Sequence, residues 1–430
     1  MPSSEWSAIE ETDVLVAGGG TAGVVAALQA ARAGVRTTMI EWTGQLGGTI
    51  TNGGVAAPAH FFTRERQVIA GIGWELIVKT KAVVGSPMPD FRPPPPHRPQ
   101  HHIGINPFVF ALIAEEESLK AGVHIHYHET VASVTPRPDG WEVETVGKNV
   151  RRRLFAREIV DATGDADVVR LAGFPVEFAE IRQPGTIRVR FGGYDPALLD
   201  VGVIESAYCR ALETGMLQPG DFAYADRPFL DFLKGHGCNA VHIPGADSSS
   251  SETQTEANLK GRAAVLRLLR FIRTLPGAEN ATVDFLAADT AVRETARIVG
   301  EVRITEADYL SGRLFPDAVA YTFYFVDLHT DHGVHHRFLP DGVVPTIPFG
   351  ALVPKGARRL LVAGRSISSD RMAHSGLRVQ ASCMAMGQAA GAAAALGIQQ
   401  NRPSREIPVQ EIRALLARHE AILPPLPGED

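Results

Sequence analysis

The fold of this chain is decided by residues 13–34, which read DVLVAGGGTAGVVAALQAARAG. The stretch opens with an apolar run at residues 13–17, a pattern typical of a parallel strand that is buried on both faces. A glycine-rich turn follows at once, and small and apolar residues then predict a helix from Val24 to Ala33. A second strand is predicted from Val35 to Ile40. Together these elements form one βαβ unit.

The glycines of this turn have the spacing of a dinucleotide-binding site. One glycine allows a tight turn, the next lets the backbone approach a pyrophosphate, and the third lets the helix pack closely against the strand. The N-terminus of the helix then presents free N–H groups and a positive dipole end to the phosphates. The residues predicted to hold the pyrophosphate are Gly18, Gly20, Thr21, Ala22 and Gly23.

Glu41 stands at the end of the second predicted strand, 18 residues after Gly23. A carboxylate at this place accepts hydrogen bonds from ribose hydroxyls and disfavours a 2′-phosphate. We therefore expect the nucleotide to be FAD or NAD rather than NADP.

The composition narrows the class of protein. The chain has 430 residues, a length that predicts two or three domains. Its composition, 45% hydrophobic and 21% charged, is typical of globular proteins. Its net charge of −6 gives no footprint for nucleic acid or an anionic membrane. Three cysteines are too few for a disulfide framework or a zinc module. Residues 1–12 lack a signal-peptide pattern, so we expect a cytoplasmic protein. We also expect its partner to be a small-molecule substrate rather than a nucleic acid or a membrane.

The rest of the chain suggests a discontinuous first domain. Buried-strand patterns return at Glu158–Ala162 and Leu360–Arg365, and small residues predict a helix over Gly376–Leu396. The region between them mixes strands and helices without a nucleotide motif. The predicted organisation is a nucleotide-binding domain of residues 1–170 and 345–402 with a Pro-rich insertion around 57–104, a substrate domain of residues 171–344, and a C-terminal helix and tail of residues 403–430.

Further elements follow from local patterns. Asn106 and Pro107 predict the start of a helix that runs to Lys120. The other predicted elements are a strand over Val123–Tyr127, a meander to about Phe155, and helices over Glu256–Thr274 and Val409–Leu416.

Several stretches, taken in their order along the chain, resemble the FAD-dependent oxidoreductases of the glutathione-reductase-like superfamily. They are residues 13–54, IVDATGDAD at 159–167, RETARIVGE at 293–301, VDLH at 326–329, and residues 347–396 with IPFGALVPKGARRLLVAGRSISSD and HSGLRVQASCMAMGQAAGAAAAL. Together they cover a little under half of the chain. The resemblance implies an α/β fold: an FAD/NAD(P)-binding Rossmann-like domain of glutathione-reductase type, with a second α+β substrate domain. It also implies FAD as the cofactor.

The resemblance further implies contacts to FAD from separate segments. Its implied contacts are Gly18, Gly20 and Gly23 at the pyrophosphate, Glu41 at the adenosine ribose, Gly47 and Gly48 near the phosphates and ribitol, Val131, Thr163, Gly164 and Asp165 at the adenine side, Gly364 and Arg365 near the ribitol, and Gly376 and Leu377 at a helix N-terminus beside the flavin. Related flavoproteins often carry an acid at the position of Arg365, so how this arginine contacts the cofactor stays open.

Five residues are candidates for the chemistry. His329, in the VDLH motif, and His60, after the Gly-rich loop, are candidate acids or bases because neutral imidazole suits proton transfer near pH 7. Arg293 and Arg297, expected on one strand, would orient an anionic substrate group, or alternatively form an ion pair with Glu294 or Glu301. Arg378 would stabilise charge that develops on the reduced flavin, or alternatively serve packing.

Other chemistry is disfavoured by the sequence. Residues 47–53 contain no cysteine pair, which excludes the dithiol chemistry of disulfide reductases. Gly71 and Gly73 lack a third glycine, so no dedicated NAD(P)H domain is predicted. His124, His126 and His128 alternate as on one face of a strand, but we predict no metal site.

The predicted activity is hydride transfer between a small organic substrate and flavin N5. Two alternatives stay open. One is a flavin monooxygenase that uses NAD(P)H and O₂, and the other is a non-catalytic FAD-binding protein. A homo-oligomer is compatible with the sequence.

Overall fold

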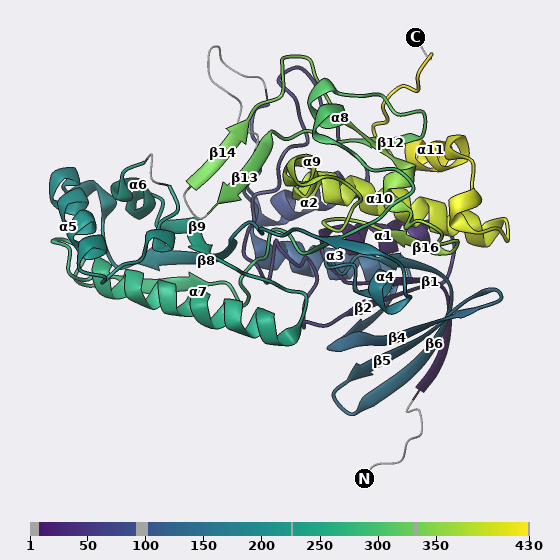
Figure 1. The fold of residues 1–430 in the computed structure, drawn as a ribbon, viewed down its shortest axis with the longest axis horizontal. Coiled ribbons are helices and arrows are strands. Elements are labelled where there is room, and N and C mark those ends of the chain that lie inside the picture. The colour runs from purple at the N-terminus through teal and green to yellow at the C-terminus, as the bar shows by residue number, and fades with distance from the viewer. Residues whose placement is uncertain (1–7, 92–101, 225–226, 331–332, 429–430) are drawn as a thin grey trace.

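A seven-stranded sheet forms the centre of the computed structural model, which describes residues 8–91, 102–224, 227–330 and 333–428 (Figure 1). Its path is β3-β2-β1-β6-β5-β4, and β16 pairs with β6. The pairs of β1 with β2 and β6, of β2 with β3 and of β6 with β16 are parallel, whereas β4, β5 and β6 form an antiparallel meander. The strands are β1 (Ala8–Ala17), β2 (Thr37–Glu41), β3 (His124–Tyr127), β4 (Glu129–Arg137), β5 (Gly140–Gly147), β6 (Val150–Asp161) and β16 (Leu360–Val362).

The predicted βαβ unit is present as β1, α1 and β2. Successive residues of β1 alternate between two hydrophobic clusters: Val14 and Val16 belong to one, and Leu15 and Ala17 to the other. This alternation explains the unbroken apolar run, because both faces of the strand are covered. The longer helices that contribute to the first cluster are α1 (Thr21–Arg32), α2 (Ile72–Val84), α3 (Pro107–Lys120), α10 (Gln380–Gln399) and α11 (Val409–Arg418).

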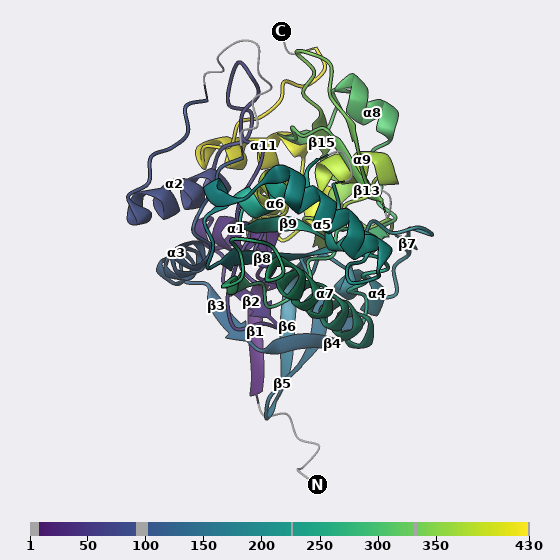
Figure 2. The ribbon, with the colours of Figure 1, turned by 90° about the vertical axis from the view of Figure 1, so that its left-hand side faces the viewer.

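A second group of elements lies to the left of this sheet in Figure 1 and in front of it in Figure 2. Strands β8 (Gly185–Gly192), β9 (Gly237–Ile243) and β10 (Thr282–Leu286) form a separate antiparallel sheet. Their apolar residues pack with helices α5 (Val201–Glu213), α6 (Phe229–Lys234) and α7 (Ser251–Ile272) in a cluster of their own. Residues 304–326 belong instead to the cluster of α1 and α10. The predicted domain limits stay a prediction.

Shorter elements complete the fold. They are α4 (Asp167–Leu171), β7 (Val176–Phe178), β11 (Ala296–Ile298), α8 (Glu306–Ser311), β12 (Ala318–Tyr321), β13 (Val326–Thr330), β14 (Gly333–Arg337), β15 (Thr346–Pro348) and α9 (Arg371–Leu377), with 3₁₀ turns at Pro196–Leu198, Pro219–Asp221, Phe349–Leu352 and Ser404–Glu406. The expected Pro-rich loop falls largely in residues 92–101, outside the described residues.

One predicted helix is wrong in its extent. The small-residue helix expected over 376–396 is two helices, because α9 ends at Leu377 and α10 begins at Gln380. Val379, the N-cap of α10, has extended backbone angles. Arg378, at the junction, sends its side chain to Asp327 and Gln183. Composition alone did not show this break, because neither glycine nor proline stands at residue 378 or 379.

Smaller differences concern element ends. β1 begins at Ala8, five residues before the predicted start, because its first half pairs with β6. α7 begins at Ser251, since the Ser250 hydroxyl accepts a hydrogen bond from Thr253 N–H and caps the helix. Arg293 precedes β11, so Arg293 and Arg297 do not share a strand as expected.

Helix α10 packs against α1 through glycines. A Cβ on Gly387 would lie 2.1 Å from Ala22 O, and one on Gly391 would lie 2.3 Å from Ala26 O. By length and hydropathy α10 is the one described helix that could cross a membrane, but 94% of its apolar window is buried within the protein. The pattern therefore reflects a core helix in contact with another helix.

This contact predicts a sensitive position. Gly391→Ala places a methyl group against a backbone carbonyl that cannot move without displacing α1, so we expect the free energy of unfolding to fall by about 1–3 kcal/mol. Gly104→Ala is the matched control, because its Cβ would meet no atom of the described chain within 4 Å. Urea unfolding of both variants tests the prediction, and equal stabilities would contradict it.

Candidate functional site

The turn between β1 and α1 is built by glycines that approach other backbone atoms. Gly18 has a φ of +98°, and a Cβ on it would lie 2.5 Å from Ala162 O. A Cβ on Gly23 would lie 1.8 Å from Gly18 O. These contacts hold the start of α1 against the ends of β1 and β6, as the glycine spacing predicts.

Gly20 differs, because the space around its Cα is open. A Cβ built on Gly20 would meet no atom of the described chain within 4 Å. Gly20 is the N-cap of α1, and no side chain of the described residues caps the helix there. Thr21 and Ala22 follow, so the first turn holds no acid that would repel an anion. We call this open start of α1, at Gly20, Thr21 and Ala22, the cradle. It fits a pyrophosphate held by helix N–H groups.

A second glycine segment lies beside the cradle. Gly47 N–H donates to Gly19 O at 2.8 Å, and Gly47 forms a parallel bridge with Gly20. Gly48 has a φ of +50°, and a Cβ on it would lie 3.0 Å from Gly20 Cα. Gly47 and Gly48, which follow β2, thus lie beside the βαβ turn, and their contact with a cofactor stays a prediction.

The Glu41 carboxylate is buried at the end of β2 and is fixed on both oxygens. Oε2 accepts from Gly19 N–H at 2.7 Å, and Oε1 accepts from Thr43 N–H at 2.8 Å and from Thr43 Oγ1 at 2.7 Å. The acid is therefore held at the edge of the cradle, the place expected for a ribose ligand.

Thr163, Gly164 and Asp165 follow β6, and Arg365 joins this segment to more distant parts of the chain. Arg365 donates to Asp165 Oδ1 at 2.6 Å, to Gly164 O at 2.8 Å and to Val292 O at 2.5 Å. Three nitrogens of the guanidinium are thus engaged by protein groups. Arg365 therefore connects separate segments of the protein by hydrogen bonds. This answers in part the question of its role, and its contact with the cofactor stays a prediction.

The remaining predicted cofactor residues lie in three places. Val131 is half-buried in β4 at an irregularity in its pairing with β5. Gly364 follows β16 with a φ of +97°, close to Ala22. Gly376 and Leu377 are buried at the end of α9, where a Cβ on Gly376 would lie 2.3 Å from the Tyr309 hydroxyl. Gly376 and Leu377 do not stand at the N-terminus of the long helix α10, as the resemblance implied. That helix begins at Gln380.

A second cluster of polar residues surrounds Asp327 on β13. His329 Nε2 lies 3.1 Å from Asp327 Oδ2, and His336 Nε2 lies 3.1 Å from Oδ1. Arg378 Nη2 donates to the backbone carbonyl of Asp327 at 3.2 Å and lies 3.7 Å from its carboxylate. Burial raises the pKa of this carboxyl, but the hydrogen bonds from His329 and His336 outweigh burial and hold the pKa well below its usual value.

His329 is engaged on both ring nitrogens. Its Nδ1 lies 2.9 Å from His242 Nε2, while its backbone N–H donates to Gln183 Oε1 at 3.0 Å. Burial, followed by the positive charge of Arg293, lowers the pKa of His329 to about 4 against the opposing effect of Asp327. Burial is also the main cause that lowers the pKa of His242 to about 2. Both imidazoles are therefore neutral at pH 7.

The two arginines of the RETARIVGE stretch have different surroundings. Arg293 is buried, donates to Pro184 O at 2.5 Å, and acts electrostatically on His329 and His242. Arg297 lies 3.7 Å from Glu294. The structure thus brings Arg293 to the Asp327 cluster, whereas the geometry of Arg297 favours the ion pair that we gave as its alternative.

His60 lies at the edge of the same region. Its ring is 4.9 Å from that of Tyr324 and 5.1 Å from that of His102. Desolvation lowers the pKa of His102 from its usual value, although part of the residue stays exposed. The backbone beside His60 also contacts α10, since Ala381 N–H donates to Ala59 O at 3.4 Å.

Sequence reasoning missed two members of this site. His242 is a single histidine in the apolar strand β9, and Gln183 lies in a segment without regular structure. No local pattern marks either residue, because both meet Asp327 and His329 only through tertiary packing. Within the described residues, no group of three or more His, Cys, Asp or Glu side chains has the arrangement of a metal site.

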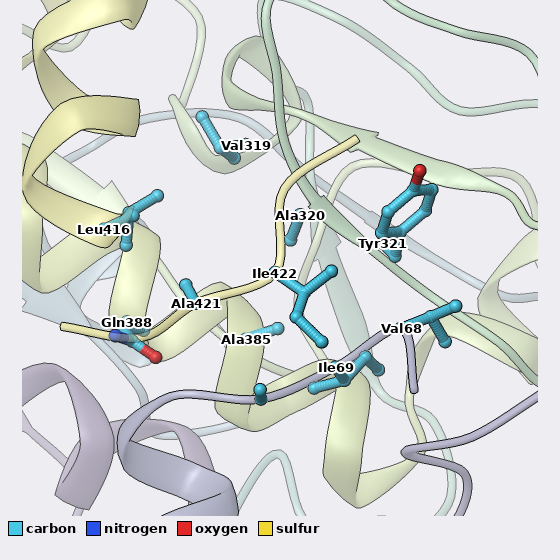
Figure 3. Close-up of a pocket in the computed structure, with 11 residues that line it drawn as sticks. Val68, Ile69, Val319, Ala320, Tyr321, Ala385, Gln388, Leu416, Ala421 and Ile422 are labelled. Atoms are coloured by element: carbon cyan, nitrogen blue, oxygen red, sulfur yellow. The ribbon is translucent and has the colours of Figure 1, made fainter. Parts of the chain in front are cut away.

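A small apolar pocket lies elsewhere, between residues 68–70, β12, α10 and the C-terminal segment (Figure 3). Its side chains are mainly aliphatic, with Tyr321 and Gln388 as the polar exceptions. It shares no residue with the cradle or the Asp327 cluster, and it is therefore separate from the site.

Comparison with known proteins identifies the class. A model of the FAD dependent oxidoreductase family matches residues 13–416, and the chain belongs to this family. The protein is an enzyme whose cofactor is FAD. The open cradle at Gly20, the uncapped N-terminus of α1 and the fixed Glu41 carboxylate fit this dinucleotide.

Two curated plant proteins are similar over short segments. Leghemoglobin reductase of Glycine max is 54% identical over 48 residues, which are 11% of this chain and 9% of that protein. Dihydrolipoyl dehydrogenase 2, mitochondrial, of Arabidopsis thaliana is 38% identical over 73 residues, which are 16% and 14%. The match thus spans less than a sixth of the length of either relative.

Solved structures are similar at a coarser level. A geranylgeranyl bacteriochlorophyll reductase-like protein of Thermoplasma acidophilum has a TM-score of 0.45 and 15% identity, covering 95% of this chain and 84% of that one. The anhydrotetracycline hydroxylase OxyS of Streptomyces rimosus has a TM-score of 0.43 and 14% identity, covering 95% and 66%. At these scores neither similarity bears on the function.

The open space at Gly20 predicts that a substitution there weakens FAD binding without destabilising the fold. Gly20→Val places its Cβ where no described atom lies within 4 Å, and residue 20 has a φ of −71° that valine tolerates. We expect the apoprotein to keep its melting temperature and its affinity for FAD to fall at least tenfold. Gly23→Val, which would collide with Gly18 O, should instead lower the yield of folded protein. Fluorescence titration with FAD tests this, and unchanged affinity in Gly20→Val would contradict it.

The buried His329 predicts a dependence of stability on pH. The pKa of His329 is about 4 in the folded protein, whereas a histidine in the unfolded chain has a pKa near 6.5. Between these values the unfolded chain binds more protons, so the free energy of unfolding falls as the pH decreases through this window. We expect His329→Gln to reduce the loss between pH 7 and pH 5 by roughly 1–2 kcal/mol.

Urea unfolding at pH 7 and pH 5 measures this difference. His124→Gln is the matched control, because His124 is exposed on β3. An identical pH dependence in wild type and His329→Gln would contradict the neutral, buried state of His329.

Proposed function

We propose that this FAD-dependent oxidoreductase transfers a hydride between a small organic molecule and flavin N5, with His329 as the residue that accepts or returns the proton. The observation that carries the proposal is the buried Asp327–His329 pair, whose contact at 3.1 Å holds a neutral imidazole beside an ionised carboxylate. A carboxylate that orients an imidazole is a recurrent arrangement in general acid–base catalysis.

The pair determines where the proton can move. Because ionised Asp327 accepts from His329 Nε2–H, the lone pair of neutral His329 is on Nδ1. His242 Nε2 lies 2.9 Å from that nitrogen, and the His242 ring also donates a hydrogen bond to the backbone of Thr330. Because His242 stands at Nδ1, its ring would have to move away before His329 takes a proton from the substrate, and Asp327 would then stabilise the imidazolium directly. His60 remains the second candidate, on the strength of its place between Tyr324 and His102.

The cofactor would be held by the cradle at Gly20 together with Glu41 and the segment Gly47–Gly48. Bound FAD supplies the two-electron carrier. The N-terminus of α10 supports the flavin placement that we propose, because Val379 brings no side-chain cap from the described residues and Gln380 anchors the helix to Val55 O at 2.6 Å. Helix N–H groups there favour negative charge on a reduced ring.

The finer assignments belong to this proposal. They are the glutathione-reductase type of the FAD fold, the division into a discontinuous FAD domain and a substrate domain, and a cytoplasmic location. The flavin monooxygenase remains the alternative activity, and it differs in requiring NAD(P)H to reduce the flavin.

A sequence of two measurements tests the proposal. The absorption spectrum of the purified protein should show flavin bands, with FAD in the supernatant after heat denaturation. Anaerobic bleaching by a panel of small alcohols, amines and hydroxy acids then identifies a reductant. We expect His329→Asn to slow bleaching by about 10²–10⁴-fold, while His124→Asn leaves the rate unchanged.

Two outcomes would count against this function. A colourless protein that takes up no added FAD would remove its basis. Rapid bleaching by NADPH, followed by oxygen consumption and hydroxylation of an aromatic acceptor, would instead establish the monooxygenase.

A further inference from the structure

The Asp327 cluster contains more buried positive than negative charge. Burial lowers the pKa of Arg293 to about 10, which still leaves the side chain cationic at pH 7. Arg378 is a second cation, and Asp327 is the one carboxylate that contacts Arg378 among the described residues. Since His329 and His242 are neutral, the described groups leave one positive charge in excess. A buried charge without a counter-charge is costly.

Neighbouring ionisable groups do not remove this excess. Glu294 accepts a hydrogen bond from the backbone N–H of Gln183. Its carboxylate forms ion pairs with Arg371 at 3.1 Å and Arg297 at 3.7 Å. With Asp370, which also acts on Arg297, these residues bring no excess negative charge to the cluster. His336, on β14, is exposed and contacts the same Asp327. Tyr224 and Tyr324, which face Arg293, are neutral because burial raises the pKa of both phenols.

The same cluster contains buried donors without partners. Gln183 is fully buried, and its Oε1 accepts from His329 N–H at 3.0 Å and from Arg378 Nη2 at 3.4 Å. Its Nε2 and the Nε of Arg378 find no hydrogen-bond partner among the described residues. Arg293 uses Nη1 for Pro184 O. Unpaired buried donors cost free energy, so a group that accepts from them is expected.

We propose that Arg293, Arg378 and Gln183 form the binding site for a carboxylate of the substrate. A carboxylate supplies both the missing negative charge and acceptors for N–H donors, and its planar geometry matches a guanidinium. The inference rests on the proposed function, because it places the anionic end of the substrate beside His329. It limits the substrates to organic acids.

The surroundings of Arg293 differ from those of buried arginines that serve a structural role. Arg365 and Arg359 are also partly or largely buried, but each pairs with a carboxylate of the chain, at 2.6 Å and 3.0 Å. Arg293 acts on Asp327 electrostatically, yet it forms no ion pair with a carboxylate of the described residues, and its guanidinium donates to Pro184 O. An arginine retained in the protein interior without its own carboxylate is expected where the partner is a ligand.

Direct binding to the FAD-loaded protein tests the proposal. Acetate, succinate and benzoate are titrated by calorimetry and by flavin difference absorption, against acetamide, succinamide and benzamide as neutral isosteres. At least one acid should bind ten times more tightly than its amide. Arg293→Gln should remove that difference, whereas Arg303→Gln, which alters an exposed pair with Glu177, should preserve it.

A second variant guards against misfolding of Arg293→Gln. Gln183→Glu keeps the shape of the side chain and the acceptor for His329 N–H, but it adds the missing negative charge. We expect this variant to melt no lower than wild type and to lose its preference for acids over amides by tenfold or more.

The outcomes separate the two proposals. FAD content is read from the spectrum before titration, so loss of FAD counts against the proposed function alone. With FAD bound, equal binding of acids and amides, or chloride binding as tightly as every acid, would overturn the carboxylate site. A preference for acids that persists in both Arg293→Gln and Gln183→Glu would also overturn it.

Discussion

The close contact between α1 and α10 is the constraint on which the rest of the site depends. Gly387 and Gly391 let α10 touch the backbone of α1 at Ala22 and Ala26. One helix begins at the open cradle of Gly20, and the other begins beside Arg378 and the backbone near His60. Because the helices pack without intervening side chains, their N-termini keep a fixed separation, and the two ends of the chain build one site.

The part of the fold that could be predicted from the sequence is the part fixed by local chemistry. In the βαβ unit, the strand periodicity, the glycine spacing and Glu41 are all encoded within residues 13–41. The helix over Pro107–Lys120 was predicted with its correct ends for the same reason, since the Asn106 side chain accepts from Phe108 and Val109 N–H groups. Such features need no knowledge of distant residues.

The remainder depends on contacts between distant segments. Asp327 and His329 are close in sequence, but His242 and Gln183 reach them from more than 80 residues away. The break between α9 and α10 has a comparable origin, because Arg378 is drawn to Asp327 and Gln183 rather than stopped by a helix-breaking residue. Arg365 resembled a cofactor ligand in sequence, yet its partners Asp165 and Val292 are visible only in three dimensions.

Asp327 couples the electrostatics of this site to its geometry. The same carboxylate contacts His329, which it holds in one tautomer, and lies near Arg378, whose charge it partly offsets. A proton gained by His329 would add a second uncompensated positive charge close to Arg293, and this repulsion adds to burial, the larger cause, in holding the pKa of His329 below its usual value. An anion bound beside the arginines would offset that charge and raise the pKa of His329. Occupation of the site would therefore make His329 a stronger base when its base function is required.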